Sequence, residues 1–180
     1  MIIKKRRILM NTDILLKRRS IRKYKDTPVP AELLDKVLEA GMYAPTGMNR
    51  QTPVMVAVTN KEIRDLLERE NARAMGDETK KPFYGAPAVI VVFYDPTVYT
   101  SFEDGCLVMG NLLNGAYAAG LGSCWIHRAK DVFETETGKM LMRKWGIPEN
   151  YIGVGNCILG FSDESPEPRP RKEGYVIKID

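Results

Sequence analysis

The order of the expected elements predicts an α+β or mixed α/β fold. Short apolar runs of strand length alternate irregularly with longer segments whose apolar residues recur at helical spacing. The 180 residues are 44% hydrophobic and 28% charged, an ordinary globular composition with enough apolar residues for a core. We therefore expect a single domain over residues 12–180, preceded by a basic N-terminal extension over residues 1–11.

Two helices are expected in the N-terminal quarter of the chain. Residues 11–13 can cap a short helix that runs to Lys17. Pro28 and Pro30 open a second helix, because a proline in the first turn gives up no hydrogen bond. The second helix has its apolar residues on one face, and Gly41 and Pro45 are expected to stop it.

The middle of the chain predicts two strands separated by a helix. A polar loop over 44–53, with breakers at both ends, precedes a strand over 54–59. Asn60 can cap a helix over 61–75. The continuous apolar run over 88–94 then predicts a second strand.

The longest helical segment, 102–119, contains three glycines. Each of Gly105, Gly110 and Gly115 costs about 1 kcal/mol relative to alanine in a helix interior, so the segment needs a compensating reason to be helical. Small residues at this spacing allow very close packing against another element. We expect a central or interface helix, and the alternative is a segment broken into two helices.

The C-terminal third predicts further strands and an irregular arm. A strand or extended turn is expected over 122–126, a helix over 130–145 and a strand over 152–161. The arm begins at residue 162 and is rich in proline and charged residues. Within it, residues 175–179 alternate like a strand, which suggests docking on a partner.

The net charge of +4 is concentrated at the N-terminus. Residues 4–7 carry four positive charges, so the rest of the chain is formally neutral and the basic pI does not indicate a nucleic-acid surface. No apolar run has membrane-spanning length, and no signal peptide is evident. These features predict a cytoplasmic protein with neither a membrane nor a nucleic-acid partner.

Several classes of chemistry lack their residues. The three cysteines, at positions 106, 124 and 157, have no metal-binding spacing and are expected to be reduced, and His127 is the single histidine. The glycine pairs at 120–122 and 153–155 lack the third glycine of a dinucleotide fingerprint. There is no nucleophile elbow. Acidic residues that could be paired are more simply explained as solvated, namely Glu134 with Glu136 and Glu164 with Glu167.

Two arginine clusters lie far apart in the sequence. They consist of Arg18, Arg19 and Arg22 near the start and of Arg169 and Arg171 near the end. The guanidinium fork matches phosphate oxygens bidentately, and a phosphate monoester needs several such partners. On charge alone, two unrelated solvated patches are an equally good explanation.

Four groups of residues, taken in order, resemble the nitroreductase family. They are LKRRSIRKY at 16–24, APTGMNRQTP at 44–53, residues 104–111 with AAGLGSCWI at 118–126, and ILGF at 158–161 with PRPRK at 168–172. Each group is modest by itself, but their order is specific. The resemblance extends over about residues 12–175, nearly the whole chain.

The resemblance implies an α+β three-layer sandwich, with a mixed, mainly antiparallel sheet flanked by helices, assembled as an intertwined homodimer. It also implies FMN bound tightly but non-covalently at the dimer interface. Arg18 and Arg19 match the family's basic pair at the phosphate, where Arg169 and Arg171 join them. Ser20 matches a polar contact to the flavin.

Other matched positions concern the flavin ring. Arg22 matches a basic residue beside the pyrimidine edge, where a fixed cation favours the anionic reduced flavin. The segment donated by the other subunit is matched by a loop that includes Pro45, Thr46, Met48, Asn49 and Gln51. Ile126, His127 and Arg128 match the stretch whose backbone lines the ring near N5. The His127 side chain is either a substrate contact or an incidental surface group, and the asparagine that some members place on the ring is not identifiable around residues 79–83.

The implied activity is ping-pong electron transfer. NAD(P)H reduces FMN and leaves, and an electron-poor small molecule such as a nitroaromatic or a quinone is then reduced in the same pocket. The alternatives on this fold are flavin reduction, metabolite dehydrogenation and reductive dehalogenation. An alternative of another class is a small basic nucleic-acid-binding protein. The helix over 102–119 and the strand over 175–179 are the expected contacts with the partner subunit.

Overall fold

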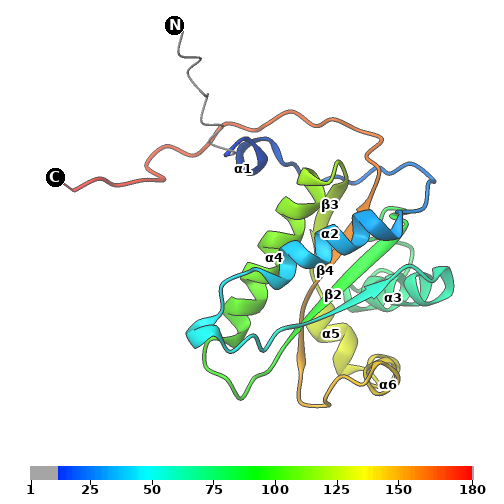
Figure 1. The fold of residues 1–180 in the computed structure, drawn as a ribbon. Helices are drawn as coiled ribbons and strands as arrows, with labels where there is room; N and C mark the ends of the chain where they lie inside the picture. Colours follow the sequence, from blue (N-terminus) through cyan, green and yellow to red (C-terminus); the bar gives the residue numbers. More distant parts are fainter. Residues whose placement is uncertain (1–11, 180) are drawn as a thin grey trace, which may run out of the picture.

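The computed structural model describes residues 12–179 (Figure 1). The expectations for residues 1–11, including Asn11 as a helix cap, and for Asp180 lie outside the described residues. One sheet carries helices against both of its faces, so the predicted α+β class is confirmed. Among residues 12–179, no helix is long and apolar enough to cross a membrane.

Four strands form the sheet in the order β1-β2-β4-β3. They are β1 (Val54–Val58), β2 (Ala88–Tyr94), β3 (Gly122–Ile126) and β4 (Ile152–Gly160). Every pairing between them is antiparallel, and a single parallel bridge joins Ser20 to Ser123. The two central strands are almost entirely buried, which for β2 agrees with its continuous apolar run. Strands β1 and β3 form the two edges, and this separation matters for the site.

One face of the sheet is covered by α2 (Ala31–Met42) and α4 (Ser101–Ala118), which pack on each other. The helix α4 is continuous, so the alternative of two shorter helices is wrong. A Cβ at Gly115 would lie 2.6 Å from the Cβ of Ala40, and one at Gly105 would lie 2.7 Å from Val154 Cγ2. Two of the three helix glycines are thus explained by close packing, whereas a Cβ at Gly110 would meet nothing within 4 Å.

Helix α2 ends at Met42, between Gly41 and Pro45, as predicted. A Cβ at Gly41 would lie 2.7 Å from Met55 Sδ on β1 and 2.9 Å from Leu112 Cδ2 on α4. Glycine at this position therefore also allows close contact with both elements.

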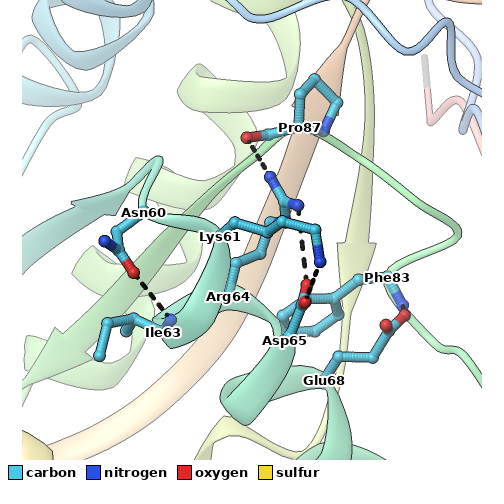
Figure 2. Close-up of polar contacts among 8 residues, drawn as sticks. All are labelled: Asn60, Lys61, Ile63, Arg64, Asp65, Glu68, Phe83 and Pro87. Atoms are coloured by element: carbon cyan, nitrogen blue, oxygen red, sulfur yellow. Dashed lines mark hydrogen bonds and ion pairs between the residues drawn. The ribbon is translucent and has the colours of Figure 1, made fainter.

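The other face carries α3 (Lys61–Ala74), α5 (Ala129–Glu134) and α6 (Glu136–Trp145). Asn60 caps α3 as predicted, accepting a backbone N–H at 3.0 Å (Figure 2). Arg64 donates to the carbonyl of Pro87 at 2.8 Å, and Glu68 accepts from the backbone N–H of Phe83 at 2.8 Å. These contacts fasten the segment that leads into β2 against the helix.

The single helix predicted over 130–145 is wrong, because the helix is interrupted at Thr135. This residue is extended, with φ −75° and ψ 161°, and its Oγ1 accepts from the N–H of Gly138 at 3.1 Å. A Cβ at Gly138 would lie 2.1 Å from the carbonyl oxygen of Val132. The tight approach of α6 to α5 therefore requires glycine and separates the two helices.

The C-terminal arm leaves the sheet at Ser162, which bridges to Tyr24, and then runs past α1 (Asp13–Lys17) (Figure 1). Residues 162–172 are irregular, as predicted. Within the described chain, residues 175–179 pair with no strand and are exposed, so the predicted docking of this segment on a partner subunit stays a prediction.

Candidate functional site

The segment Arg18–Arg22 is fixed along the edge strand β3. Ser20 bridges to Ser123, and the N–H of Ile21 donates to the carbonyl of Ser123 at 3.0 Å. A Cβ at Gly122 would lie 2.8 Å from Ile21 Cγ1, so glycine at this position allows the close approach. The sheet edge therefore holds the basic segment rigidly.

Arg18 and Arg19 line a cavity of about 260 Å³ at the C-terminal end of α4. Tyr117 and Glu164 also contribute to its wall. Two guanidinium nitrogens, Arg18 Nη1 and Arg19 Nε, are buried and have no hydrogen-bond partner within residues 12–179. A buried donor without an acceptor is costly, and more so when it is charged. The cavity is therefore lined by positively charged groups whose hydrogen-bond donors are not all satisfied.

Arg19 also connects this cavity to the far end of the chain. Its Nη1 donates to the carbonyls of Leu16 and Arg18, at 2.8 and 2.7 Å, which fixes the direction of the guanidinium. Arg19 lines a second hollow of about 480 Å³ together with Arg169 and Arg171. Two arginine clusters separated by 147 residues in the sequence therefore meet around α1. Several guanidinium groups around one hollow are the arrangement that a phosphate dianion requires.

Arg22 is exposed, and its N–H donates to Glu164 Oε1. Glu164 is exposed, as expected for a solvated carboxylate. It also has a role that the sequence did not indicate, because it holds the backbone of the basic segment and lines the cavity. The contact spans 142 residues of sequence, and no local pattern predicts it.

Ile126, His127 and Arg128 lie where β3 ends and α5 begins. Arg128 has φ 79°, which turns the chain sharply into the helix. The carbonyl of His127 accepts from Asn71 Nδ2 at 2.8 Å, and the carbonyl of Ile126 accepts from Asn156 Nδ2 at 3.4 Å. The His127 side chain is exposed.

Asn71 is a residue that the sequence analysis missed. It lies on α3, is fully buried, and its Oδ1 has no partner within the described part of the chain. A signal was present, because Ile63, Leu67 and Asn71 follow one another at helical spacing on the face that packs on the sheet. A lone amide in an apolar stripe marks a polar contact. Here that contact orients the backbone at His127.

The loop from Pro45 to Gln51 is strained and exposed. Met48, Asn49 and Gln51 have φ values of 54°, 53° and 52°, in the left-handed region. Each such residue costs about 1–3 kcal/mol and persists where its surroundings determine it, commonly at functional sites. The Met48 side chain is 85% exposed, and Pro45 is also exposed. Internal hydrogen bonds join Gln51 N to Thr46 Oγ1 at 3.1 Å and Gln51 Nε2 to Asn49 Oδ1 at 2.9 Å.

Within the chain, this loop and the arginine segment lie far apart. The loop leads into β1 and the arginine segment lies on β3, and the three strand spacings between these edges amount to about 14 Å. The loop is hydrogen-bonded to Asp104 at one end of α4, whereas the arginine segment lines a cavity together with Tyr117 at the other end. Thirteen residues separate these two positions, about 20 Å along a helix. The predicted site residues therefore form two groups.

Comparison with known proteins gives a consistent result. The model of the nitroreductase family matches residues 15–161. A Bacteroides fragilis nitroreductase solved with bound FMN is 26% identical, with a TM-score of 0.86 over 93% of this chain and 97% of that one. An NADH dehydrogenase of Thermus thermophilus is 40% identical over 145 residues, 80% of this chain and 64% of that protein. An NADPH-flavin oxidoreductase of Vibrio harveyi is 26% identical over 93% of this chain and 73% of its own length.

The family model extends over both the edge segment and the loop, and the fold agrees with that of the solved relative over 93% of this chain. This chain belongs to the nitroreductase family.

Proposed function

We propose that this protein is an FMN-dependent oxidoreductase that takes electrons from NADH or NADPH and passes them to an electron-poor small molecule, such as a nitroaromatic or a quinone. The observation that carries the proposal is a cavity lined by Arg18 and Arg19, two arginines that each have one buried guanidinium nitrogen without an acceptor within the described chain. Membership of the nitroreductase family and the FMN named for the Bacteroides relative support the choice of cofactor.

The phosphate of FMN would bind among the guanidinium groups of both clusters. Arg18 and Arg19 come from the edge segment, and Arg169 and Arg171 from the arm. Bidentate contacts from several arginines offset the double negative charge, and the anion in turn satisfies the buried donors. The residues present therefore fit this group.

The ring would lie toward Arg22 and the Ile126–Arg128 stretch, with Ser20 as a polar contact between the two ends. When bound, the flavin supplies the two-electron chemistry. Arg22 holds a positive charge beside the pyrimidine edge and stabilises negative charge that develops there. Asn71 holds the carbonyl of His127, which fixes the backbone that lines the ring. Specificity for the acceptor would come from the pocket over the ring and not from an acid-base group.

A homodimer would complete this site. If α4 of two copies packs antiparallel across a two-fold axis, the strained loop of one copy approaches the arginine segment of the other. The outer face of α4 is suited to this role, because Phe102 is 50% exposed, Leu107 is 47% exposed and Gly110 has open space where a Cβ would stand. Tyr175 and Ile177 on the arm are also exposed, and a partner subunit would cover them.

The visible spectrum of the purified protein tests the cofactor. We expect flavin absorbance at about one FMN per chain, released on denaturation, together with the mass of a dimer in light scattering. A colourless protein that cannot be reconstituted with FMN would contradict the proposal. If the protein instead binds nucleic acid tightly at low salt and loses that binding as the salt concentration rises, the nucleic-acid alternative is favoured.

The oxidation of NADH and NADPH, followed with and without added acceptors, tests the activity. We expect stimulation by nitroaromatics and quinones under anaerobic conditions. Stimulation by free flavin alone would identify a flavin reductase, and turnover only with a halogenated aromatic would identify a dehalogenase. If no acceptor stimulates turnover of the FMN-loaded protein, the reductase activity is wrong.

A further inference from the structure

The first turn of α4 grips both ends of the strained loop. Asp104 is only 3% exposed, and its Oδ1 accepts the N–H of Gly47 at 2.9 Å. At the other end, the hydroxyls of Thr52 and Ser101 are hydrogen-bonded at 2.8 Å. Ser101 is fully buried, and its Oγ also accepts the N–H of Asp95 at 3.0 Å. Both anchors on the helix are therefore buried and directed at the loop.

The fit at Gly47 is too close for any other residue. A Cβ there would lie 2.2 Å from Thr100 Oγ1 and 2.9 Å from Thr100 Cβ. The hydroxyl of Thr100 in turn donates to Asp104 Oδ2 at 3.1 Å. Each carboxylate oxygen of Asp104 therefore accepts one hydrogen bond. Gly47 packs directly against Thr100, which orients the carboxylate.

The residues between the two anchors are the ones with unfavourable backbone conformations. Met48, Asn49 and Gln51 all have positive φ, and their side chains are exposed. A loop tied at one end only would relax toward conformations that these residues prefer. Two buried anchors on one rigid helix turn prevent this relaxation. The strained conformation is therefore held by the two anchors on α4 together with the hydrogen bonds inside the loop.

We propose that Asp104 is a positioning residue of the flavin site, which holds the Pro45–Gln51 loop in the shape that it presents to the flavin of a second copy. The proposal rests on the proposed function, because the loop acts on a cofactor held by the partner. Asp104 touches neither cofactor nor substrate. It acts through the N–H of Gly47, and the strained residues that follow are the contact surface.

A purely structural role for Asp104 must be separated from this one. An acidic residue in the first turn also stabilises a helix through its dipole. Glu103 stands in the same turn and is exposed, and within residues 12–179 it makes no hydrogen bond or ion pair with the loop, so Glu103→Gln is the matched control. The test variants are Asp104→Ala, which removes the acceptor, and Asp104→Asn, which keeps one oxygen for Gly47. Gly47→Ala disturbs the same contact from the loop side and leaves Asp104 in place.

The experiment combines backbone hydrogen exchange with FMN titration on the full chain. In Asp104→Ala we expect the amides of residues 47–51 to exchange about tenfold faster or more without FMN, while β2 and β4 exchange as before. The FMN dissociation constant should rise by about tenfold, through faster release. Asp104→Asn should lie between wild type and alanine, Gly47→Ala should reproduce the alanine result, and Glu103→Gln should match wild type.

Three results would overturn the proposal. One is unchanged exchange of residues 47–51 in both Asp104→Ala and Gly47→Ala. Another is exchange that rises equally across α4 and the sheet, which would assign Asp104 to general stability. The third is a looser loop with wild-type FMN affinity and release. If wild type itself binds no FMN, the proposed function fails and so does the positioning role, whereas the exchange data still report on the grip alone.

Discussion

The arginine segment on β3 and the loop before β1 are two halves of the candidate site that are built in opposite ways. Arg18–Arg22 lies on the sheet edge in ordinary backbone geometry, and its unsatisfied groups are side-chain donors. The 45–51 loop has its backbone strained and its side chains exposed. The arginine segment, the binding half, is thus suited to hold an anion. The loop, the presented half, is suited to place its side chains against another surface.

The largest effect is expected from the binding half. Arg19→Ala should raise the FMN dissociation constant about a hundredfold. Arg19 lines both hollows, and the substitution removes its charge-assisted hydrogen bonds to the phosphate. Fluorescence titration of FMN measures this constant. Arg50→Ala, an exposed arginine of the presented half, serves as the control. An equal loss of FMN affinity in Arg19→Ala and Arg50→Ala would contradict the distinction between the two halves.

A smaller effect of opposite sign is expected from the presented half. Met48→Gly should raise the free energy of unfolding by about 0.5–1 kcal/mol, because glycine adopts a positive φ without steric cost. The same change should weaken FMN binding, since it frees the loop. Chemical denaturation and FMN titration provide the two measurements. A loss of stability would mean that Met48 makes contacts that offset its strain.

The binding half can itself be divided by function. Arg22→Ala should lower the reduction potential of bound FMN by about 30 mV, since about 1.4 kcal/mol of charge stabilisation is lost in a two-electron couple. Arg171→Ala should mainly weaken binding, because it lies at the phosphate hollow. Dye-coupled redox titration and FMN titration separate the two effects. If each variant changes potential and affinity alike, the two ends of the flavin have been assigned in reverse.

The smallest effect is expected in the rate at which a disulfide reagent labels the cysteine thiols, which also reports on the exposed face of α4. Burial raises the pKa of Cys157 to about 12, so this thiol is neutral at pH 8 and should not react with a disulfide reagent until the protein unfolds. Cys106 on α4 is half-buried, and burial raises the pKa of its thiol as well. It should therefore react slowly in a monomer, faster as pH rises, and hardly at all if a second copy covers α4. Rapid labelling of Cys106 in a dimer would place the interface elsewhere.

Sequence reasoning succeeded where the determining contacts were local. The cap at Asn60 and the strand at 88–94 follow from residues within a few positions of one another. It failed at Thr135, because the apolar pattern of residues 130–145 is helical throughout, whereas the Thr135 cap and the close approach of Gly138 to Val132 divide the segment into two helices. A pattern that is helical or alternating does not contain that information.

The same limit applies to the site. The two arginine clusters could be selected by charge and by family resemblance, and the structure brings Arg19 to the hollow of Arg169 and Arg171. Glu164 and Asp104 were missed because each acts on a backbone group of a remote segment, and such a hydrogen bond leaves no spacing signature in the sequence. Asn71 stands out in the apolar stripe of its helix, but the stripe does not identify its partner, the carbonyl of His127.

The buried guanidinium groups of Arg18 and Arg19 have a further consequence for the protein in the cell. A ligand that satisfies them binds the native chain and not the unfolded one, so occupancy adds RT ln(1 + [FMN]/Kd) to the stability. At FMN a hundredfold above the dissociation constant, this amounts to about 2.7 kcal/mol. Chains made when flavin is scarce should therefore unfold more often and be degraded sooner. The steady amount of this protein should follow the flavin supply of the cell, even at a constant rate of synthesis.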